Sequence, residues 1–227
     1  MRDRTIHILD DNHSSFPPVK NAKSSGLLAV GGELSTTRLL EAYMKGIFPW
    51  YSKGCPVMWW SPDPRCVLIL SELRVSRSLR REIAKNNFVI TQNKAFEEVI
   101  HYCSSVDRPH QKGTWLQPEM IEAYSELNRL GYAHSVEAWK DGRLVGGLYG
   151  VVLGSVFFGE SMFHLEPNAS KIAFVALVKH LIKEEFTLID CQQTTPHMLA
   201  LGAKEISRKE FTTLLNKGLE NFIQVTI

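Results

Sequence analysis

Two segments of alternating residues around Asp141-Gly142 constrain the fold of this chain most strongly. His134–Lys140 and Arg143–Tyr149 flank this dipeptide, which suits the positive φ of a two-residue hairpin turn. Beyond the hairpin, the pattern predicts a strand, a long helix capped by Asn168 and another strand, over residues 155–162, 168–185 and 188–191. A hairpin followed by strand, helix and strand predicts an α+β domain with a mixed, largely antiparallel sheet and flanking helices.

The remaining predicted elements are shorter, and several have recognisable helix caps. Ser35, Ser76 and Ser207 each precede a helical pattern and can accept hydrogen bonds from first-turn N–H groups. Pro118 suits the first turn of a further helix. We therefore expect helices at 35–45, 76–85, 95–103, 118–131, 195–201 and from 207 onward, and short strands at 66–70, 88–91 and 204–206.

The first quarter of the chain looks different from the rest. Residues 26–32 read as an apolar turn segment, and prolines on both sides of Asp63 argue against regular structure there. This Pro- and aromatic-rich part ends near residue 66. A chain of 227 residues is long enough for one large domain or two small ones. We expect a small N-terminal domain at 1–66 and a larger domain at 67–227.

Composition excludes several classes of protein. The formal net charge of +2 names no partner, so an RNA-binding function would require a local basic patch. The 4 cysteines form no CxxC pair and complete no zinc pattern with histidine, which favours reduced thiols and no bound metal. No apolar run is long enough for a membrane helix or placed as a secretory signal. We therefore expect a cytoplasmic protein without a membrane partner.

The strand at 188–192 ends in polar residues and is the first candidate for chemistry. Side chains alternate along a strand, so Asp190 and Gln192 are expected to point to one side and Cys191 to the other. A carboxylate and an amide at the end of an apolar strand are costly unless they meet partners or a ligand.

A basic stripe and a set of tryptophans suggest RNA. Arg77, Arg80 and Arg81 recur at helical spacing, and Glu82 is the one acidic residue of that predicted helix. A solvated helix face is the plain alternative, but a phosphate backbone would fit a stripe of one sign. Loop tryptophans can stack on bases, although core packing is the default for any one of them. The tryptophans in question are Trp50, Trp59, Trp60 and Trp115.

Glu160 lies among apolar strand residues, where it is either a surface residue or a functional carboxylate. Its sequence context, Gly159-Glu160-Ser161, lacks the second glycine of a nucleophile elbow. No phosphate-binding GxxxxGK[ST] loop and no dinucleotide fingerprint is present, which argues against ATP hydrolysis and dinucleotide binding.

Seven short motifs, in this order, resemble those of the leucyl/phenylalanyl-tRNA–protein transferase family. Each is weak alone, but the ordered set is specific, and the resemblance spans about residues 24–211. The motifs are GLLAVGG (26–32), GIFPW (46–50), WWSPDPR (59–65), GTW (113–115), FGESMF (158–163), NASK (168–171) and LIDCQ (188–192).

The resemblance implies a small N-terminal domain and a C-terminal domain similar to the GNAT acyltransferase fold. It implies an aminoacyltransferase that moves Leu or Phe, with Met as a further candidate, from aminoacyl-tRNA to an N-terminal Arg or Lys. The product would be an N-degron of the N-end rule pathway. It also implies no cofactor and no metal, and we expect a monomer.

The resemblance also assigns roles to individual residues. Gln192 would contact the attacking amine, Asp190 would orient that amine or attract the cationic N-terminus, and Glu160 would lie at the pocket rim. Trp50 and Trp115 would contact the terminal adenosine of the tRNA, and Arg77, Arg80 and Arg81 the acceptor-stem phosphates. The apolar pocket for the transferred side chain would use Leu148, Met162, Phe174, Leu177, Leu181 and Ile189.

Two other functions compete with this interpretation. An acetyl-CoA-dependent acetyltransferase needs a glycine-rich turn before its central helix, whereas residues 166–171 hold no glycine and include an acid. A non-catalytic RNA-binding module would explain the Trp and Arg residues. It would not explain Asp190 and Gln192 at a strand end.

Overall fold

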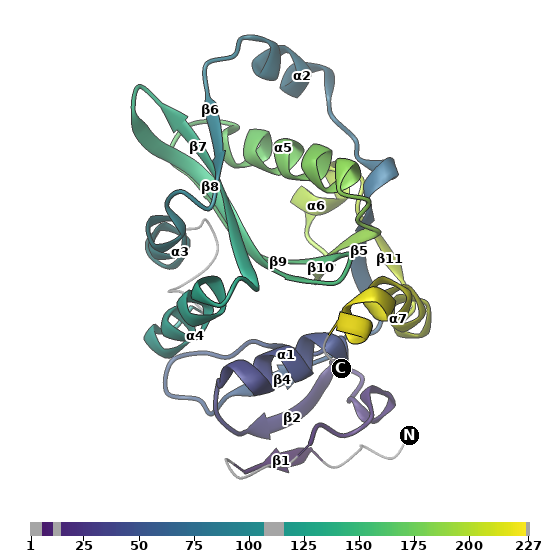
Figure 1. Ribbon diagram of the computed structural model, residues 1–227. Coiled ribbons are helices and arrows are strands. Elements are labelled where there is room, and N and C mark those ends of the chain that lie inside the picture. The colour runs from purple at the N-terminus through teal and green to yellow at the C-terminus, as the bar shows by residue number, and fades with distance from the viewer. Residues whose placement is uncertain (1–5, 11–14, 107–115, 226–227) are drawn as a thin grey trace.

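The computed structural model describes residues 6–10, 15–106 and 116–225, with side chains to residue 220. Within these ranges, seven strands form a large mixed sheet in the order β11-β5-β10-β9-β8-β7-β6. Figure 1 shows this curved sheet across the middle of the molecule. Its strands are β5 (Arg65–Ile69), β6 (Val89–Gln92), β7 (Ala133–Lys140), β8 (Arg143–Leu153), β9 (Val156–His164), β10 (Leu188–Gln192) and β11 (Lys204–Ile206).

The predicted hairpin forms the centre of this sheet. β7 and β8 pair antiparallel around Asp141, whose φ of 52° is the left-handed value that the turn requires. β8 also pairs antiparallel with β9, whereas β9 and β10 are parallel neighbours. The expected α+β class with a mixed, largely antiparallel sheet is therefore confirmed.

Helices cover both faces of the large sheet. α5 (Ala169–Lys183) lies on one face with α2 (Arg77–Ala84) packed against it, while α3, α4 and α7 lie on the other face (Figure 1). The other helical bounds are α1 (Thr36–Met44), α3 (Phe96–Ser105), α4 (Pro118–Arg129), α6 (Pro196–Ala200), α7 (Arg208–Val225) and the 3-10 turns Val19–Asn21 and Leu70–Glu72.

The predicted caps are mostly confirmed. The side chains of Ser35 and Ser76 accept hydrogen bonds from the N–H groups of Arg38 and Leu79. Asn168 does precede α5, but it takes a left-handed φ of 68° and makes no capping hydrogen bond with its side chain. The prediction of a side-chain cap there was wrong, because this backbone conformation leads a turn directly into the helix.

The N-terminal part is more regular than predicted. Within the described ranges, four short strands form a second sheet, shown at the bottom of Figure 1, in the order β1-β2-β4-β3. The segment read as an apolar turn is therefore a strand, and the Pro- and Trp-rich segment holds two more. Their bounds are β1 (His7–Leu9), β2 (Leu27–Gly31), β3 (Phe48–Pro49) and β4 (Met58–Trp60).

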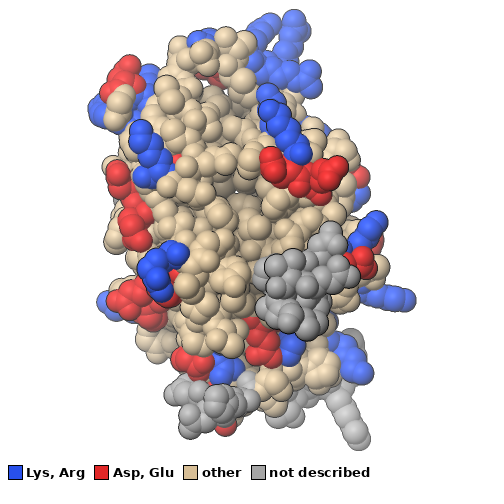
Figure 2. All heavy atoms as spheres, viewed as in Figure 1, with Lys and Arg blue, Asp and Glu red and all other residues tan. Residues whose placement is uncertain are grey.

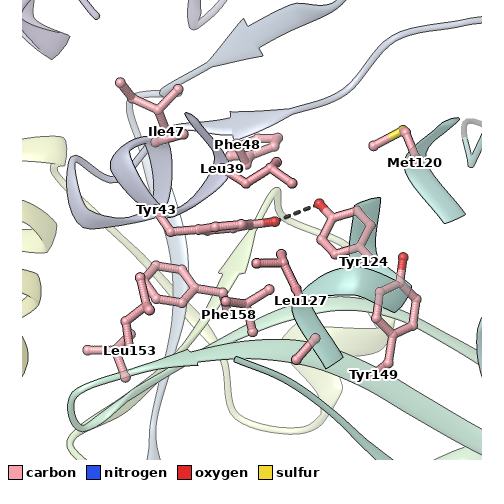
Figure 3. Packing of buried hydrophobic residues seen from close by; sticks show 14 of the residues in the cluster. Leu39, Tyr43, Ile47, Phe48, Met120, Tyr124, Leu127, Tyr149, Leu153 and Phe158 are labelled. Atoms are coloured by element: carbon pink, nitrogen blue, oxygen red, sulfur yellow. Dashed lines mark hydrogen bonds between the residues drawn. The ribbon is translucent and has the colours of Figure 1, made fainter. Parts of the chain in front are cut away.

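The two faces of the large sheet bury separate hydrophobic clusters. One cluster packs α5 against the sheet, and it includes Leu148, Phe174 and Ile189. The other joins the opposite face to α3, α4, α7 and the N-terminal part, as Figure 3 shows for Tyr43, Tyr124 and neighbouring apolar residues. The candidate site lies between these two clusters. In the described part of the chain, no helix is long and apolar enough to cross a membrane.

Candidate active site

A pocket of about 860 Å³ opens where β9 and β10 part. The two strands pair only over Leu188–Asp190 and the opposite residues of β9. Beyond this point, residues Gly159–Ser161 of β9 and Cys191 and Gln192 of β10 line the pocket. Its volume lies within the roughly 300–1,000 Å³ that is usual for small-ligand sites.

The backbone of β10 changes course at the same point. Its pairing with β5 shifts register between Asp190 and Gln192, and Gln192 has a left-handed φ of 61°. Such a conformation costs free energy in a non-glycine residue and tends to persist at functional sites. The bulge places the Gln192 side chain beside Glu160 of the neighbouring strand.

Glu160 accepts hydrogen bonds from side chains of three different elements. Tyr43 of α1 donates to Oε1 over 2.8 Å, Tyr124 of α4 donates to Oε2 over 2.9 Å, and Gln192 Nε2 donates to Oε1 over 2.7 Å. The two tyrosine hydroxyls also lie 2.6 Å apart, as the dashed line in Figure 3 shows. Three oxygen–oxygen contacts thus link Glu160 and the two tyrosines.

Burial raises the pKa of Glu160 to about 7, although the hydrogen bonds from Tyr43, Tyr124 and Gln192 oppose this shift. The nearby charge of Asp190 adds to the rise. The two tyrosines supply two hydroxyl protons for three contacts, so one contact lacks a proton while Glu160 is ionised, and protonation of Glu160 supplies it. Burial together with the Glu160 charge also raises the pKa of both tyrosines well above the ordinary value, which keeps them as hydrogen-bond donors.

Asp190 lies directly behind Gln192 and is fully buried. Arg65 of β5 donates from Nε to Oδ1 over 2.8 Å and from Nη2 to Oδ2 over 2.6 Å. The Arg65 guanidinium is itself held between the rings of Phe48 and Phe211. Asp190 Oδ1 also accepts a hydrogen bond of 2.9 Å from the backbone N–H of Gln192. Because both oxygens of Asp190 are engaged by Arg65, we treat Asp190 as a positioning residue rather than a substrate contact.

The residues predicted for the apolar pocket divide into two groups. Four of them line the pocket, together with Phe157 and Met198; they are Leu148, Met162, Phe174 and Ile189. Leu177 and Leu181 share the same helix but are buried in the hydrophobic cluster beneath and are absent from the described lining. For these two, the helical stripe reflects core packing.

The predicted RNA contacts that the structure describes lie in two places. Trp50 lines the pocket, is 40% exposed and meets Trp60 edge to face at 5.7 Å. Trp115 falls outside the described residues. The arginines predicted to bind RNA are exposed on α2; they are Arg77, Arg80 and Arg81. Figure 2 shows blue side chains gathered at the top of the visible face, where Figure 1 places α2.

Three residues of this site escaped prediction. Tyr43 and Tyr124 lie on apolar helical stripes, where a tyrosine cannot be told from an ordinary core residue. In the sequence, Arg65 comes directly before the apolar strand predicted at 66–70. That position could have indicated its role, because a buried cation needs a buried anion. In the described part of the chain, no group of three metal-ligating side chains comes together.

Two family models match the chain. The model described as leucyl/phenylalanyl-tRNA protein transferase matches residues 67–216, and the model for the N-terminal domain of the same family matches residues 32–63. Together they include all residues of the Glu160 network, since Tyr43 falls in the second range and Tyr124, Glu160 and Gln192 in the first.

Several curated proteins are similar over nearly the whole chain, and they are named leucyl/phenylalanyl-tRNA–protein transferase. The protein from Syntrophotalea carbinolica is 56% identical over 89% of this chain and 88% of its own length. The protein from Syntrophobacter fumaroxidans is 55% identical over 92% of this chain and 89% of its own length.

Solved structures with a partly similar chain path are distant in sequence. They include L-PGS from Bacillus licheniformis, with a TM-score of 0.44 and 10% identity over 74% of this chain and 54% of that chain. They also include a GCN5-related N-acetyltransferase from Kribbella flavida, with a TM-score of 0.34 and 11% identity over 74% of this chain and 60% of that chain. On the family models and the curated relatives, the chain belongs to the leucyl/phenylalanyl-tRNA–protein transferase family.

Proposed function

We propose that this protein transfers Leu or Phe from aminoacyl-tRNA to the N-terminal Arg or Lys of an acceptor protein. Met is a further candidate for the transferred residue, and the product would be an N-degron. The observation that carries the proposal is the network of Gln192, Glu160, Tyr43 and Tyr124 at a pocket that apolar side chains also line. Such a pocket suits an apolar amino acid held beside a reacting amine.

The reaction needs positioning more than activation. The ester of an aminoacyl-tRNA is already reactive, so no ATP and no cofactor are required. Holding the ester and the amine together can supply much of the rate enhancement. The acceptor amine attacks the ester carbonyl, the new C–N bond forms, and the ribose oxygen leaves with a proton.

Gln192 is the group that we assign to the attacking amine. Its Nε2 donates to Glu160, and this fixes the orientation of the amide because an ionised carboxylate only accepts hydrogen bonds. The Gln192 Oε1 is then the end of the amide that is available to accept a hydrogen bond from the incoming N–H group. Asp190 and Arg65 would keep the backbone of Gln192 in its left-handed conformation.

The donor substrate would extend from this network along the pocket. Leu148, Met162, Phe174 and Ile189 would surround the Leu or Phe side chain, and Trp50 would stack on the terminal adenosine. We assign the same role to Trp115. The exposed stripe of Arg77, Arg80 and Arg81 would contact acceptor-stem phosphates.

The wider organisation follows from this proposal. Charged tRNA is a cytoplasmic substrate, so we place the protein in the cytoplasm, and we propose that it acts as a monomer. We also propose domains at 1–66 and 67–227, with the boundary inside β5.

The decisive experiment combines labelled Phe-tRNA with a peptide that begins with Arg. We expect label to enter the peptide without ATP or CoA, and an otherwise identical peptide with an N-terminal Asp to remain unlabelled. Failure to transfer label, while a characterised family member does so in parallel, would refute the proposal. Transfer of an acetyl group from acetyl-CoA instead would favour an acetyltransferase, and RNA binding without any transfer would favour a binding module.

A further inference from the structure

One side of the pocket carries three basic residues that the proposed chemistry does not use. His164 ends β9, Lys171 lies in the first turn of α5, and His197 lies in α6; all three line the pocket. We call these three residues the basic rim. Glu160 is the one acidic residue among the described lining residues, and its carboxylate is bonded by Tyr43, Tyr124 and Gln192.

The members of the basic rim are close enough to influence one another. Burial lowers the pKa of His197, and the positive charges of Lys171 and His164 lower it further. In addition, His197 Nε2 is a buried atom with no hydrogen-bond partner in the described part of the chain. An unpaired buried nitrogen beside a lysine is costly in the free protein and calls for a ligand.

The acidic residue before α5 does not neutralise the rim. Glu166 forms an ion pair of 3.2 Å with Lys140 of β7, so its charge is balanced away from Lys171. Among the described residues, Lys171 takes part in no ion pair. The N-terminal end of α5, which is the positive end of the helix dipole, adds to the positive electrostatic potential at the rim. The rim therefore collects basic side chains from three separate elements, with no acidic side chain paired to Lys171 among the described residues.

The charges on the two proposed substrates decide which of them meets this rim. An acceptor peptide brings an N-terminal ammonium group and a cationic Arg or Lys side chain, both of which Lys171 would repel. The tRNA brings a phosphodiester immediately before its terminal adenosine. Lysine and histidine are suitable hydrogen-bond donors to a phosphate.

We infer that the basic rim of His164, Lys171 and His197 binds the phosphodiester on the 5′ side of the terminal adenosine. This inference rests on the proposed function, because it supplies the RNA part of that same site. It also assigns each of the two substrates to its own side of the pocket. The RNA crosses the rim formed by β9, α5 and α6, and the acceptor enters from another side.

The test compares two small donors that differ by this phosphate. One is phenylalanyl-adenosine, and the other is the dinucleotide CpA carrying Phe on its 3′ ribose. We expect the wild-type protein to prefer the dinucleotide in kcat/KM by roughly 10- to 100-fold, the range for a charge-assisted hydrogen bond. Lys171→Ala should reduce this preference to near unity, and Lys171→Arg should restore most of it.

Lys179→Ala is the matched control. Lys179 lies on the same helix, is exposed and lines a different, small pocket beside α2. This variant should keep the wild-type preference for the dinucleotide. If Lys171→Ala keeps that preference, or if it changes only the KM of the acceptor peptide, the assignment of the rim to RNA is wrong.

A binding measurement separates this inference from the proposed function. Unacylated CpA and adenosine are titrated into the protein while its tryptophan fluorescence is recorded. The wild type should bind CpA more tightly than adenosine, and Lys171→Ala should lose that difference even in a protein that transfers nothing. Equal affinity of the wild type for CpA and adenosine would overturn the inference, whatever the outcome of the transfer assay.

Discussion

Arg65 and Asp190 form a fully buried, two-bond ion pair directly behind the pocket, with Nε–Oδ1 and Nη2–Oδ2 distances of 2.8 and 2.6 Å. The pair joins β5 to β10 at the place where the β10 backbone bulges. Through the Gln192 N–H group, it connects the interior of the protein to the residue that we assign to the attacking amine.

Breaking this ion pair should cost both stability and transfer. Arg65→Met leaves a buried carboxylate without its partner, which we expect to lower the free energy of unfolding by about 3–5 kcal/mol. The double variant Arg65→Met/Asp190→Leu should regain most of that stability, as urea unfolding would show. Its transfer rate should stay low because the Gln192 N–H group has lost its acceptor. A double variant with wild-type transfer would show that the pair serves stability alone.

Gln192→Ala should reduce turnover while donor binding is kept. Loss of the group that contacts the attacking amine is expected to lower kcat roughly 100-fold or more. Gln92→Ala changes an exposed glutamine of β6 that is absent from the described pocket lining, and it is the matched control. Single-turnover transfer from Phe-tRNA and binding of the same tRNA would be measured for both. Equal losses of kcat in the two variants would argue against the role assigned to Gln192.

Arg80→Ala should act on tRNA binding instead. Removing one phosphate contact is expected to weaken binding of all tRNAs and to reduce the slope of log K against log salt by about 1. Lys209→Ala provides an exposed cation on α7, which covers the opposite face of the sheet from α2. If Arg80→Ala and Lys209→Ala show the same affinity and the same salt slope, α2 is not the RNA surface.

The raised pKa of Glu160 predicts how stability depends on pH. Its folded pKa of about 7 lies above its usual value of 4.5, so the folded state binds this proton more tightly. The contribution of Glu160 to the free energy of unfolding is therefore fully present below about pH 4.5 and is lost as the pH rises to about 7. Urea unfolding between pH 4.5 and 8 should show this decline, and Glu160→Gln should lack it.

The same group should shape the pH dependence of transfer. Above pH 7, the ionised Glu160 attracts the cationic amine and accepts from Gln192, so kcat/KM should rise through an inflection near the pKa of about 7. The groups around it are the neutral Tyr43 and Tyr124 hydroxyls, the Gln192 amide and Asp190, which is ion-paired with Arg65. A Glu160→Gln variant that kept the same inflection would assign it to the substrate amine.

Local sequence patterns predicted most of the regular structure, because the residues in each pattern themselves favour the turn, cap or helix start. Asp141-Gly142 meets the turn geometry, Ser35 and Ser76 cap their helices, and Pro118 begins α4. The small sheet was missed because its strands are short and their pairing depends on partners distant in sequence. No local pattern specifies such partners.

The candidate site was predicted only in part for the same reason. Asp190, Gln192 and Glu160 stood out because polar groups in apolar strands are costly. Arg65 and the two tyrosines contact them across 125, 117 and 36 positions of sequence separation. Such contacts depend on the folded arrangement and could not be assigned in advance. The resemblance named the pocket residues, but it could not separate Phe174 from the core residues Leu177 and Leu181.

Tyr43 comes from α1, in the part of the chain that builds the small sheet, yet its hydroxyl bonds a carboxylate of the large sheet. The candidate active site is thus built from both the N-terminal part and the larger part of the chain. A shortened protein that began at β5 would lose Trp50 from the pocket lining and, with Tyr43, one of the proton donors that set the ionisation of Glu160. A chimera that combines the two parts from related proteins would be active only where this tyrosine lies in the same position relative to Glu160.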